Sequence, residues 1–295
     1  MKPPELIRPN LKTRIEDFSR EERAKLESDG LHGNLFEEFR DRQTSTIAWE
    51  SQQIAKSHGI YLQWNRARTG QEKDWRYMIR FAIPGGGPLC PAQWRILDDL
   101  SDRYTANPDG FPSLRITTRQ NLQFHWVRKE QVVEIVGRAA ESGLFTLNGC
   151  GDNVRNIMAC PLSRFSSAFN ATTWAHLAAD YFRLPGGAAI EIFAIDPAYL
   201  RDPQERFSYA PNLLNRKFKI AFSAIHWDGT RRTLVPDNCV EIRTNDIGVA
   251  PLVPHGEDGQ VDRFQIYIGG GQGEKNGKPT FSALGEPFGI VGKDD

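Results

Sequence analysis

Basic side chains beside strands and glycine turns are the part of this sequence most suited to chemistry. The group comprises Arg80 before a glycine-rich turn at 84–88, Arg155 in a glycine-flanked loop, and Arg216, Lys217 and Lys219 in an apolar segment. Cations held by strands or tight turns are suited to binding an anion. A single basic residue is more often a solvated surface charge, so the interpretation rests on the group.

The segment 114–126, with the sequence LRITTRQNLQFHW, carries the strongest positional pattern. Its period of two predicts one half-buried strand, with Leu122, Phe124 and Trp126 on an apolar face. No Asp or Glu occurs between Ser113 and Arg128. We therefore expect the opposite face to bind a large anion through Arg115, Thr117, Arg119, Asn121, Gln123 and His125.

Composition describes a globular protein without a global charge bias. The 295 residues are enough for two domains, and 37 basic residues balance 37 acidic ones. Global charge thus gives no argument for nucleic acid or membrane binding. No apolar run approaches the ~18 residues of a membrane span, and residues 1–10 lack a signal-peptide core. These patterns predict a cytoplasmic protein with no nucleic-acid or membrane partner.

Four cysteines do not form a recognisable metal or disulfide pattern. They are Cys90, Cys150, Cys160 and Cys239, with no C-x-x-C pair among them. In a chain of this length we interpret them as small, buried or half-buried thiols, and we assign no residue to a metal.

The elements that must position these residues follow from periodicity and turn signals. A capping box of Ser19 and Glu22 opens a helix, and a strand begins after Asp74. Helices are predicted at 91–104, 129–142 and 172–182, with strands at 114–126, near Leu144, at 216–222 and at 264–268. The glycines at 269–271 could hold an anion, and the tail at 275–295 is predicted to be weakly structured.

This order of elements predicts an α+β fold. We expect an N-terminal helical arm at 1–60, a ferredoxin-like half-domain at 61–147 and a mixed α/β domain at 148–295.

Five segments, in this order, resemble the successive motifs of the siroheme- and [4Fe–4S]-dependent nitrite/sulfite reductase family. They are 76–87, 114–126, 151–161, 215–222 and 268–273, of which TTRQNLQFHW and RKFK are the most specific. The resemblance covers roughly residues 58–290.

The resemblance implies an assimilatory-type, six-electron reduction of sulfite to sulfide or nitrite to ammonium. Siroheme is a tetrapyrrole fringed with carboxylates, which suit bidentate arginine and amide donors. By motif, siroheme would be bound by the polar face of 114–126 together with Arg216, and the oxyanion by Arg80, Arg155, Lys217 and Lys219. A ferredoxin or a flavoprotein would supply electrons.

The family holds its cluster with two close cysteine pairs in the second half of its full-length chain. The cysteines of this sequence lack that spacing, so the cluster role is not transferred to them. We expect an N-terminal half of the enzyme: a truncation, a split subunit completed by a separate C-terminal half, or a decayed fragment. Apolar surface would then be exposed for a partner.

Three other functions are open. One is a cobalamin-pathway relative within the same family, and another is a non-catalytic tetrapyrrole- or anion-binding module. A third is an RNA-binding module, against which the zero net charge and the expected burial of Phe124 and Trp126 count. Sulfite and nitrite are not distinguished, because both need the same positive pocket.

Overall fold

The computed structural model describes residues 15–68, 73–165, 169–200, 218–223, 226–227, 232–233, 246–252, 261–271, 274–275, 278–281 and 283–294. The helices are α1 (Arg20–Leu26), α2 (Leu35–Arg40), α3 (Trp49–Ser57), α4 (Pro91–Tyr104), α5 (Val132–Glu141), α6 (Ala171–Tyr181) and α7 (Gly187–Phe193). Short 3-10 helices are η1 (Ile15–Asp17), η2 (Pro84–Gly86), η3 (Lys129–Gln131), η4 (Ser163–Phe165) and η5 (Pro197–Tyr199).

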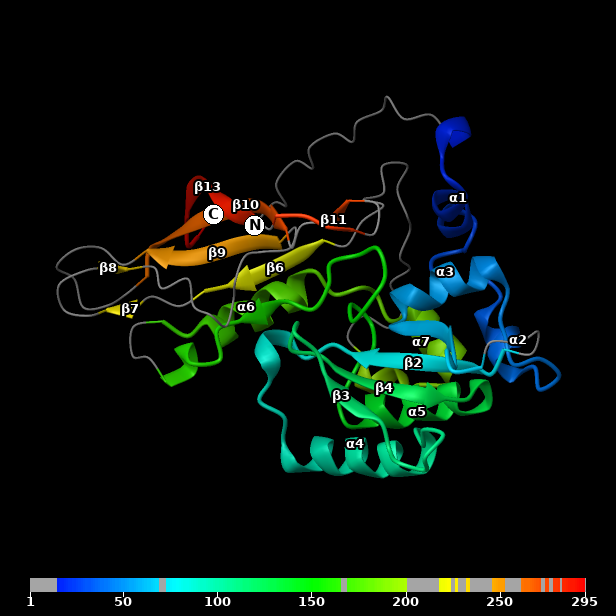
Figure 1. Cartoon of the computed structure of the whole chain (residues 1–295). Helices are drawn as coiled ribbons and strands as arrows, with labels where there is room; N and C mark the ends of the chain where they lie inside the picture. Colours follow the sequence, from blue (N-terminus) through cyan, green and yellow to red (C-terminus); the bar gives the residue numbers. More distant parts are fainter. Residues whose placement is uncertain are drawn as a thin grey trace.

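The strands form two main sheets and two short hairpins (Figure 1). The first sheet contains β1 (Ile60–Trp64), β2 (Trp75–Phe81), β3 (Leu114–Ile116) and β4 (Leu122–Val127). The second contains β5 (Met158–Ala159), β6 (Lys219–Phe222), β9 (Asp246–Leu252), β10 (Arg263–Gly271) and β13 (Ala283–Gly292). The short pairs are β7 (His226–Trp227) with β8 (Arg232–Thr233), and β11 (Glu274–Lys275) with β12 (Lys278–Pro279).

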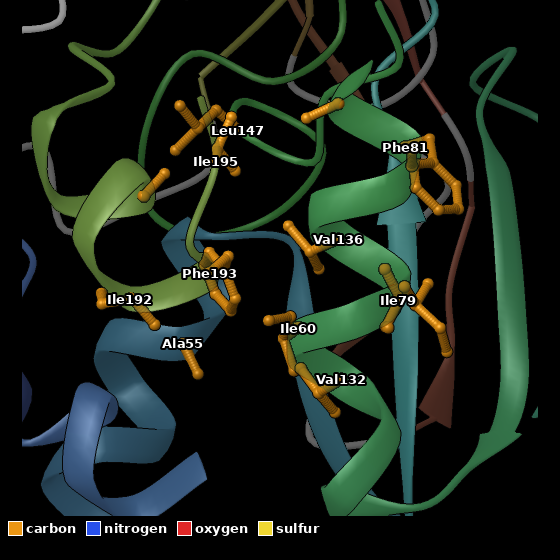
Figure 2. Close-up of a cluster of buried hydrophobic side chains, with 14 of the residues drawn as sticks. Ala55, Ile60, Ile79, Phe81, Val132, Val136, Leu147, Ile192, Phe193 and Ile195 are labelled. Carbon is orange, nitrogen blue, oxygen red and sulfur yellow. The ribbon is translucent and has the colours of Figure 1, made fainter. Parts of the chain in front are cut away.

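The first sheet is antiparallel, in the order β1-β2-β4-β3, and it is covered on one face by helices. Alternate residues of β2, among them Ile79 and Phe81, are completely buried, as the period-two pattern predicts. Figure 2 shows Val132 and Val136 of α5 beside Ile79. The opposite face of this sheet therefore carries the residues of the other parity, including Arg80.

The predicted single strand at 114–126 is wrong, because the segment is a β-hairpin. Strands β3 and β4 pair antiparallel, with Arg115 opposite Gln123. The turn between them is closed by a hydrogen bond from the amide of Thr117 to the carbonyl of Asn121, 2.8 Å, and Gln120 has φ +56°. A chain that reverses direction cannot keep six alternate residues on one strand face.

A bulge also changes the second half of the hairpin. Tyr77 pairs with Val127 and Ile79 with Phe124, so two residues of β4 oppose the one residue between them on β2. Trp126 takes φ +63° within this bulge. The parity therefore shifts, and Val127, not Trp126, is completely buried. The expectation that Trp126 shares the core face with Phe124 is wrong.

The second sheet has the order β13-β10-β9-β6-β5, with parallel pairs at β5–β6–β9 and antiparallel pairs at β9–β10–β13. Helix α6 packs beneath it (Figure 1). The 275–295 tail is more ordered than expected, since it supplies the ten-residue strand β13. The glycines at 269–271 belong to β10, and no strand forms near Leu144.

The N-terminal helices share the core of the first sheet. Helix α1 begins after the predicted capping box, in which Ser19 and Glu22 bond each other's backbone amides. Leu31, Leu35 and Phe39 are buried in the same apolar cluster as Ile79. The domain boundaries at 60/61 and 147/148 stay a prediction. The mixture of helices and sheets confirms the α+β class.

Candidate functional site

Three polar side chains on the open face of the first sheet are joined in a row. The guanidinium of Arg80 donates from Nε and Nη2 to Oε1 of Gln123, at 3.1 and 2.9 Å. The Gln123 amide nitrogen lies 2.9 Å from Nε2 of His125. Because this amide nitrogen can only donate, Nε2 of His125 accepts, and its ring proton is assigned to Nδ1.

His125 is held in its neutral form. Burial, together with the positive charges of Arg115 and Arg80, lowers its pKa to about 4. The structure thus places Arg115, Gln123 and His125 on one face, as the sequence predicts, and it also places Arg80 beside them. His125 offers a hydrogen bond without adding a charge at neutral pH.

Close backbone packing fixes the position of Arg80. Its amide donates to the carbonyl of Gly59 at 2.9 Å. A Cβ at Gly59 would lie 2.7 Å from the carbonyl oxygen of Arg80, and one at Gly149 would lie 2.6 Å from the same atom. Two segments far apart in sequence therefore press on one peptide group, which leaves the Arg80 backbone little room to move.

Arg155 is a buried cation on the loop before the second sheet. The residue is only 6% exposed, and its Nε donates a hydrogen bond to the carbonyl of Gly151 at 2.5 Å. Its amide donates to the carbonyl of Phe218 at 2.7 Å. Lys219 follows Phe218 as the first residue of β6, so this pairing brings Arg155 beside the start of the predicted basic strand.

The hydroxyl of Tyr61 on β1 makes a hydrogen bond with Arg155 and feels the charge of Arg80, and the sequence pattern does not single this residue out. Burial raises the pKa of its hydroxyl, and Cys150 acts in the same direction. The positive charges of Arg155 and Arg80 and a hydrogen bond with Arg155 oppose that rise. The alternation in 60–64 is the signal that could have identified a strand here.

The polar side chains of the hairpin turn form hydrogen bonds within the protein, with β5 and the segment that leads into it. Nη2 of Arg119 donates to the carbonyl of Asn156 at 3.1 Å, and the Asn156 amide donates back to the Arg119 carbonyl at 3.0 Å. Gln120 makes two hydrogen bonds with the backbone of Ala159, at 2.7 and 3.0 Å. The turn thereby fastens the first sheet to β5 of the second.

Two further turn residues have similar internal roles. Oγ1 of Thr117 accepts the amides of Arg119 and Asn121, at 3.3 and 3.1 Å. Asn121 is 3% exposed, and its Oδ1 faces the amide of Ile83 at 3.5 Å. The structure therefore does not place Thr117, Arg119 and Asn121 in the row with Arg80, and their binding of a cofactor stays a prediction.

Arg216 and Lys217 lie outside the described residues. Within the described residues, no three His, Cys, Asp or Glu side chains gather where a metal ion could be held. Cys90 is exposed, while Cys150 and Cys160 are buried. In this same part of the chain, none of the helices has the length and apolar character needed to cross a bilayer.

The side chains of the site carry positive charge that is not balanced by ion pairs within the described residues. Among the described residues, no carboxylate forms an ion pair with Arg80, Arg115 or Arg155. A buried guanidinium without a counter-ion is unfavourable unless an anion completes it. The donor set of guanidinium, amide and imidazole groups fits the carboxylate fringe of siroheme. The described residues do not fit a [4Fe–4S] cluster, which needs a set of cysteine thiolates.

Comparison with known proteins agrees with this arrangement. Residues 69–142 match the family model of the nitrite/sulfite reductase ferredoxin-like half domain, and residues 150–294 match that of the nitrite and sulphite reductase 4Fe-4S domain. The chain is 34% identical over 278 residues to the sulfite reductase [NADPH] hemoprotein beta-component of Acidithiobacillus ferrooxidans, covering 91% of this chain and 46% of that protein.

Two other matches are similar in extent. The sulfite reductase [ferredoxin] of Synechococcus elongatus is 36% identical over 263 residues, covering 81% of this chain and 39% of that protein. The solved structure of the Mycobacterium tuberculosis NirA protein has a TM-score of 0.54 at 22% identity, covering 85% of this chain and 40% of the other. The chain belongs to the nitrite and sulfite reductase family, and it spans less than half the length of these relatives.

Proposed function

We propose that this chain supplies the siroheme- and substrate-binding side of an enzyme that reduces sulfite to sulfide or nitrite to ammonium. The observation that carries the proposal is the group of Arg80, Arg115 and Arg155, which no carboxylate of the described residues neutralises. Arg155 is only 6% exposed. Such a group is suited to a small oxyanion beside a polycarboxylate cofactor.

The roles divide by position. Arg80, Arg155 and Lys219, with Lys217, would hold the oxyanion, while Arg115, Gln123 and His125 would bind siroheme carboxylates. Thr117, Arg119, Asn121 and Arg216 are assigned to siroheme by motif. When bound, siroheme would supply the iron centre at which the substrate receives electrons.

Protons are best supplied by the lysines. Guanidinium stays protonated at all ordinary pH values, whereas the pKa of a lysine falls readily beside like charges. Lys219 begins β6 next to the residue that fastens Arg155. His125, neutral because burial lowers its pKa to about 4, would orient an acceptor without delivering a proton.

The groups that would deliver electrons are not among the described residues. The relatives' names specify NADPH or ferredoxin as donor, and either route would serve here. The relatives are about twice as long as this chain. The cluster ligands would lie on a part that corresponds to their remaining length, either on this protein or on a separate chain. The assembled enzyme would act in the cytoplasm.

Siroheme loading tests the binding part of the proposal. Wild-type chain supplied with siroheme should show a Soret-region band, which sulfite or nitrite should shift. Arg155→Ala should retain the band and lose the anion-induced shift, whereas Arg95→Ala, at an exposed position of α4, should keep both. A wild-type protein that stays colourless would contradict the siroheme assignment.

Reductive turnover tests the enzymatic part. With the complementary half and an electron donor present, formation of sulfide or ammonium is expected. A Lys217→Ala/Lys219→Ala double variant should lose turnover while keeping siroheme. Turnover that is unchanged in this variant would contradict proton delivery by the lysines. Siroheme binding without any product would leave a non-catalytic tetrapyrrole-binding module.

A further inference from the structure

An ion pair connects the N-terminal helices to the loop that carries Arg155. Nζ of Lys25 on α1 contacts Oδ2 of Asp152, which lies 127 residues further along the chain. The Lys25 side chain is 3% exposed and that of Asp152 is 29% exposed. A charge buried to this degree in an arm helix is unusual, and its carboxylate partner lies three residues before Arg155.

A second lysine of the arm lies close to the same carboxylate. The pKa of Lys56, on α3, is lowered mainly by burial, while the negative charge of Asp152 opposes that effect. Lys25 lowers it further, so the three groups share one electrostatic environment. The carboxylate of Asp152 thus pairs with one cation of the arm and attracts a second.

Steric packing holds the loop to the arm at the adjacent residue. Gly151 has φ +89°, a conformation that favours glycine. A Cβ there would lie 2.7 Å from Cα of Ser57, the last residue of α3. Position 151 is therefore in direct backbone contact with the arm, and Asp152 is fixed on one side by this contact and on the other by Lys25.

The same residue connects the arm to Arg155. The carbonyl of Gly151 accepts the Nε–H of Arg155 at 2.5 Å. This bond fixes the plane of the guanidinium, which also makes a hydrogen bond with the Tyr61 hydroxyl. A displacement of the Gly151 peptide group would rotate its carbonyl and with it the guanidinium.

We propose that the Lys25–Asp152 ion pair is a positioning device for Arg155, through which the N-terminal helices set the affinity of the site for its oxyanion. This inference rests on the proposed function for the identity of the anion. The device itself is a property of the chain without ligands. Asp152 acts through Gly151 and does not touch the substrate.

Neutralising Asp152 separates positioning from direct electrostatics. If Asp152 acted only through its charge, Asp152→Asn would strengthen anion binding, because it removes a negative charge near a cationic pocket. If Asp152 positions Arg155, the same change weakens binding, since the ion pair that ties the loop to Lys25 is lost. The two mechanisms predict opposite signs.

The first measurement needs neither cofactor nor activity. In the ligand-free chain, the hydrogen-exchange rate of the Arg155 Nε–H is followed by nuclear magnetic resonance. Asp152→Asn and Lys25→Met should each accelerate this exchange about 10-fold relative to wild type. Arg20→Gln, which breaks the exposed pair of Arg20 with Glu50 on the same helices, should leave it unchanged.

The second measurement is a sulfite titration of the siroheme-loaded chain. The Kd for sulfite should rise about 10-fold in Asp152→Asn, with siroheme affinity unchanged. The charge-exchanged double variant Lys25→Asp/Asp152→Lys should recover part of both the exchange protection and the sulfite affinity. Recovery in the double variant would show that the attraction between positions 25 and 152 is what matters, and not either side chain alone.

Distinct outcomes separate the failure of this inference from that of the proposed function. Exchange at Arg155 Nε that is unaffected by Asp152→Asn, or tighter sulfite binding in that variant, would overturn the positioning role. A wild-type chain that binds no siroheme would overturn the proposed function, yet the exchange measurement would still decide whether the ion pair positions Arg155. If a single variant does not fold, the Lys25→Asp/Asp152→Lys double variant is measured in its place. Its hydrogen-exchange rate at Arg155 Nε then decides whether the ion pair positions Arg155.

Discussion

The two parts of the β-hairpin at 114–127 have the same alternating sequence and different uses. In the strands, Arg115, Gln123 and His125 face outward beside Arg80 and are available to a ligand. In the turn, Arg119 bonds the backbone of Asn156, and Gln120 bonds that of Ala159 in β5 of the second sheet. Residue type alone therefore does not mark a binding residue, because the local direction of the chain decides what the side chain contacts.

The largest difference between the two parts should come from Arg80. Arg80→Ala removes a charge that no described carboxylate compensates, so sulfite affinity of the siroheme-loaded chain should fall about 100-fold. The free energy of unfolding should change little. Arg80→Lys should have an intermediate sulfite affinity, because lysine keeps the positive charge but lacks the planar set of donors of the guanidinium. If Arg80→Ala lowered the unfolding free energy as much as it lowered the binding free energy for sulfite, strand residues would not differ from turn residues in their role.

Gln120 should show the reverse behaviour. Gln120→Ala deletes two hydrogen bonds with Ala159, and the unfolding free energy should fall by about 1–3 kcal/mol in urea titrations. The exposed neighbour Thr118→Ala serves as the control. If Gln120→Ala instead weakened sulfite binding with no loss of stability, the turn would belong to the ligand site.

Acid should weaken the strand face through His125. Its folded-state pKa of about 4 lies below the ordinary value of 6.5, so the unfolded chain binds the proton first. Stability should therefore be full above about pH 6.5 and decline as the pH falls towards 4. In His125→Gln the decline should be smaller, by on the order of 1 kcal/mol for this partly exposed group. Unfolding at pH 7 and pH 5 measures this difference.

The smallest effect is expected at Ile116. The period-two pattern places it on the core face, whereas the hairpin leaves it 75% exposed. Ile116→Thr should change the unfolding free energy by no more than about 0.5 kcal/mol. A loss of 2 kcal/mol or more, of the order that a core position gives, would mean that β3 packs differently.

Local signals predicted much of the fold. The bounds of α4 match the prediction, because proline at the first turn and apolar spacing mark it. The alternation of β2 correctly assigned Ile79 to the core and Arg80 to the open face. The glycine-flanked loop identified Arg155, and in the structure its charge and that of Arg80 both act on the hydroxyl of Tyr61.

Features that depend on distant partners were not predictable. The turn at 117–121 contains neither glycine nor proline, and it is stabilised by Thr117 and by bonds to the second sheet. The bulge at Trp126 requires knowledge of the register with β2. The Lys25–Asp152 pair joins residues 127 positions apart, which no local pattern contains.

The packing of Gly59 and Gly149 against the carbonyl of Arg80 has a consequence for folding kinetics. The position of Arg80 requires contacts among the residue before β1, the end of β2 and the loop before the second sheet, which are separated by long stretches of chain. Contacts of such sequence separation form late, after loop closure and local helices. We therefore expect anion binding to appear in the last phase of refolding, and to report completion of the native state more strictly than helical content does.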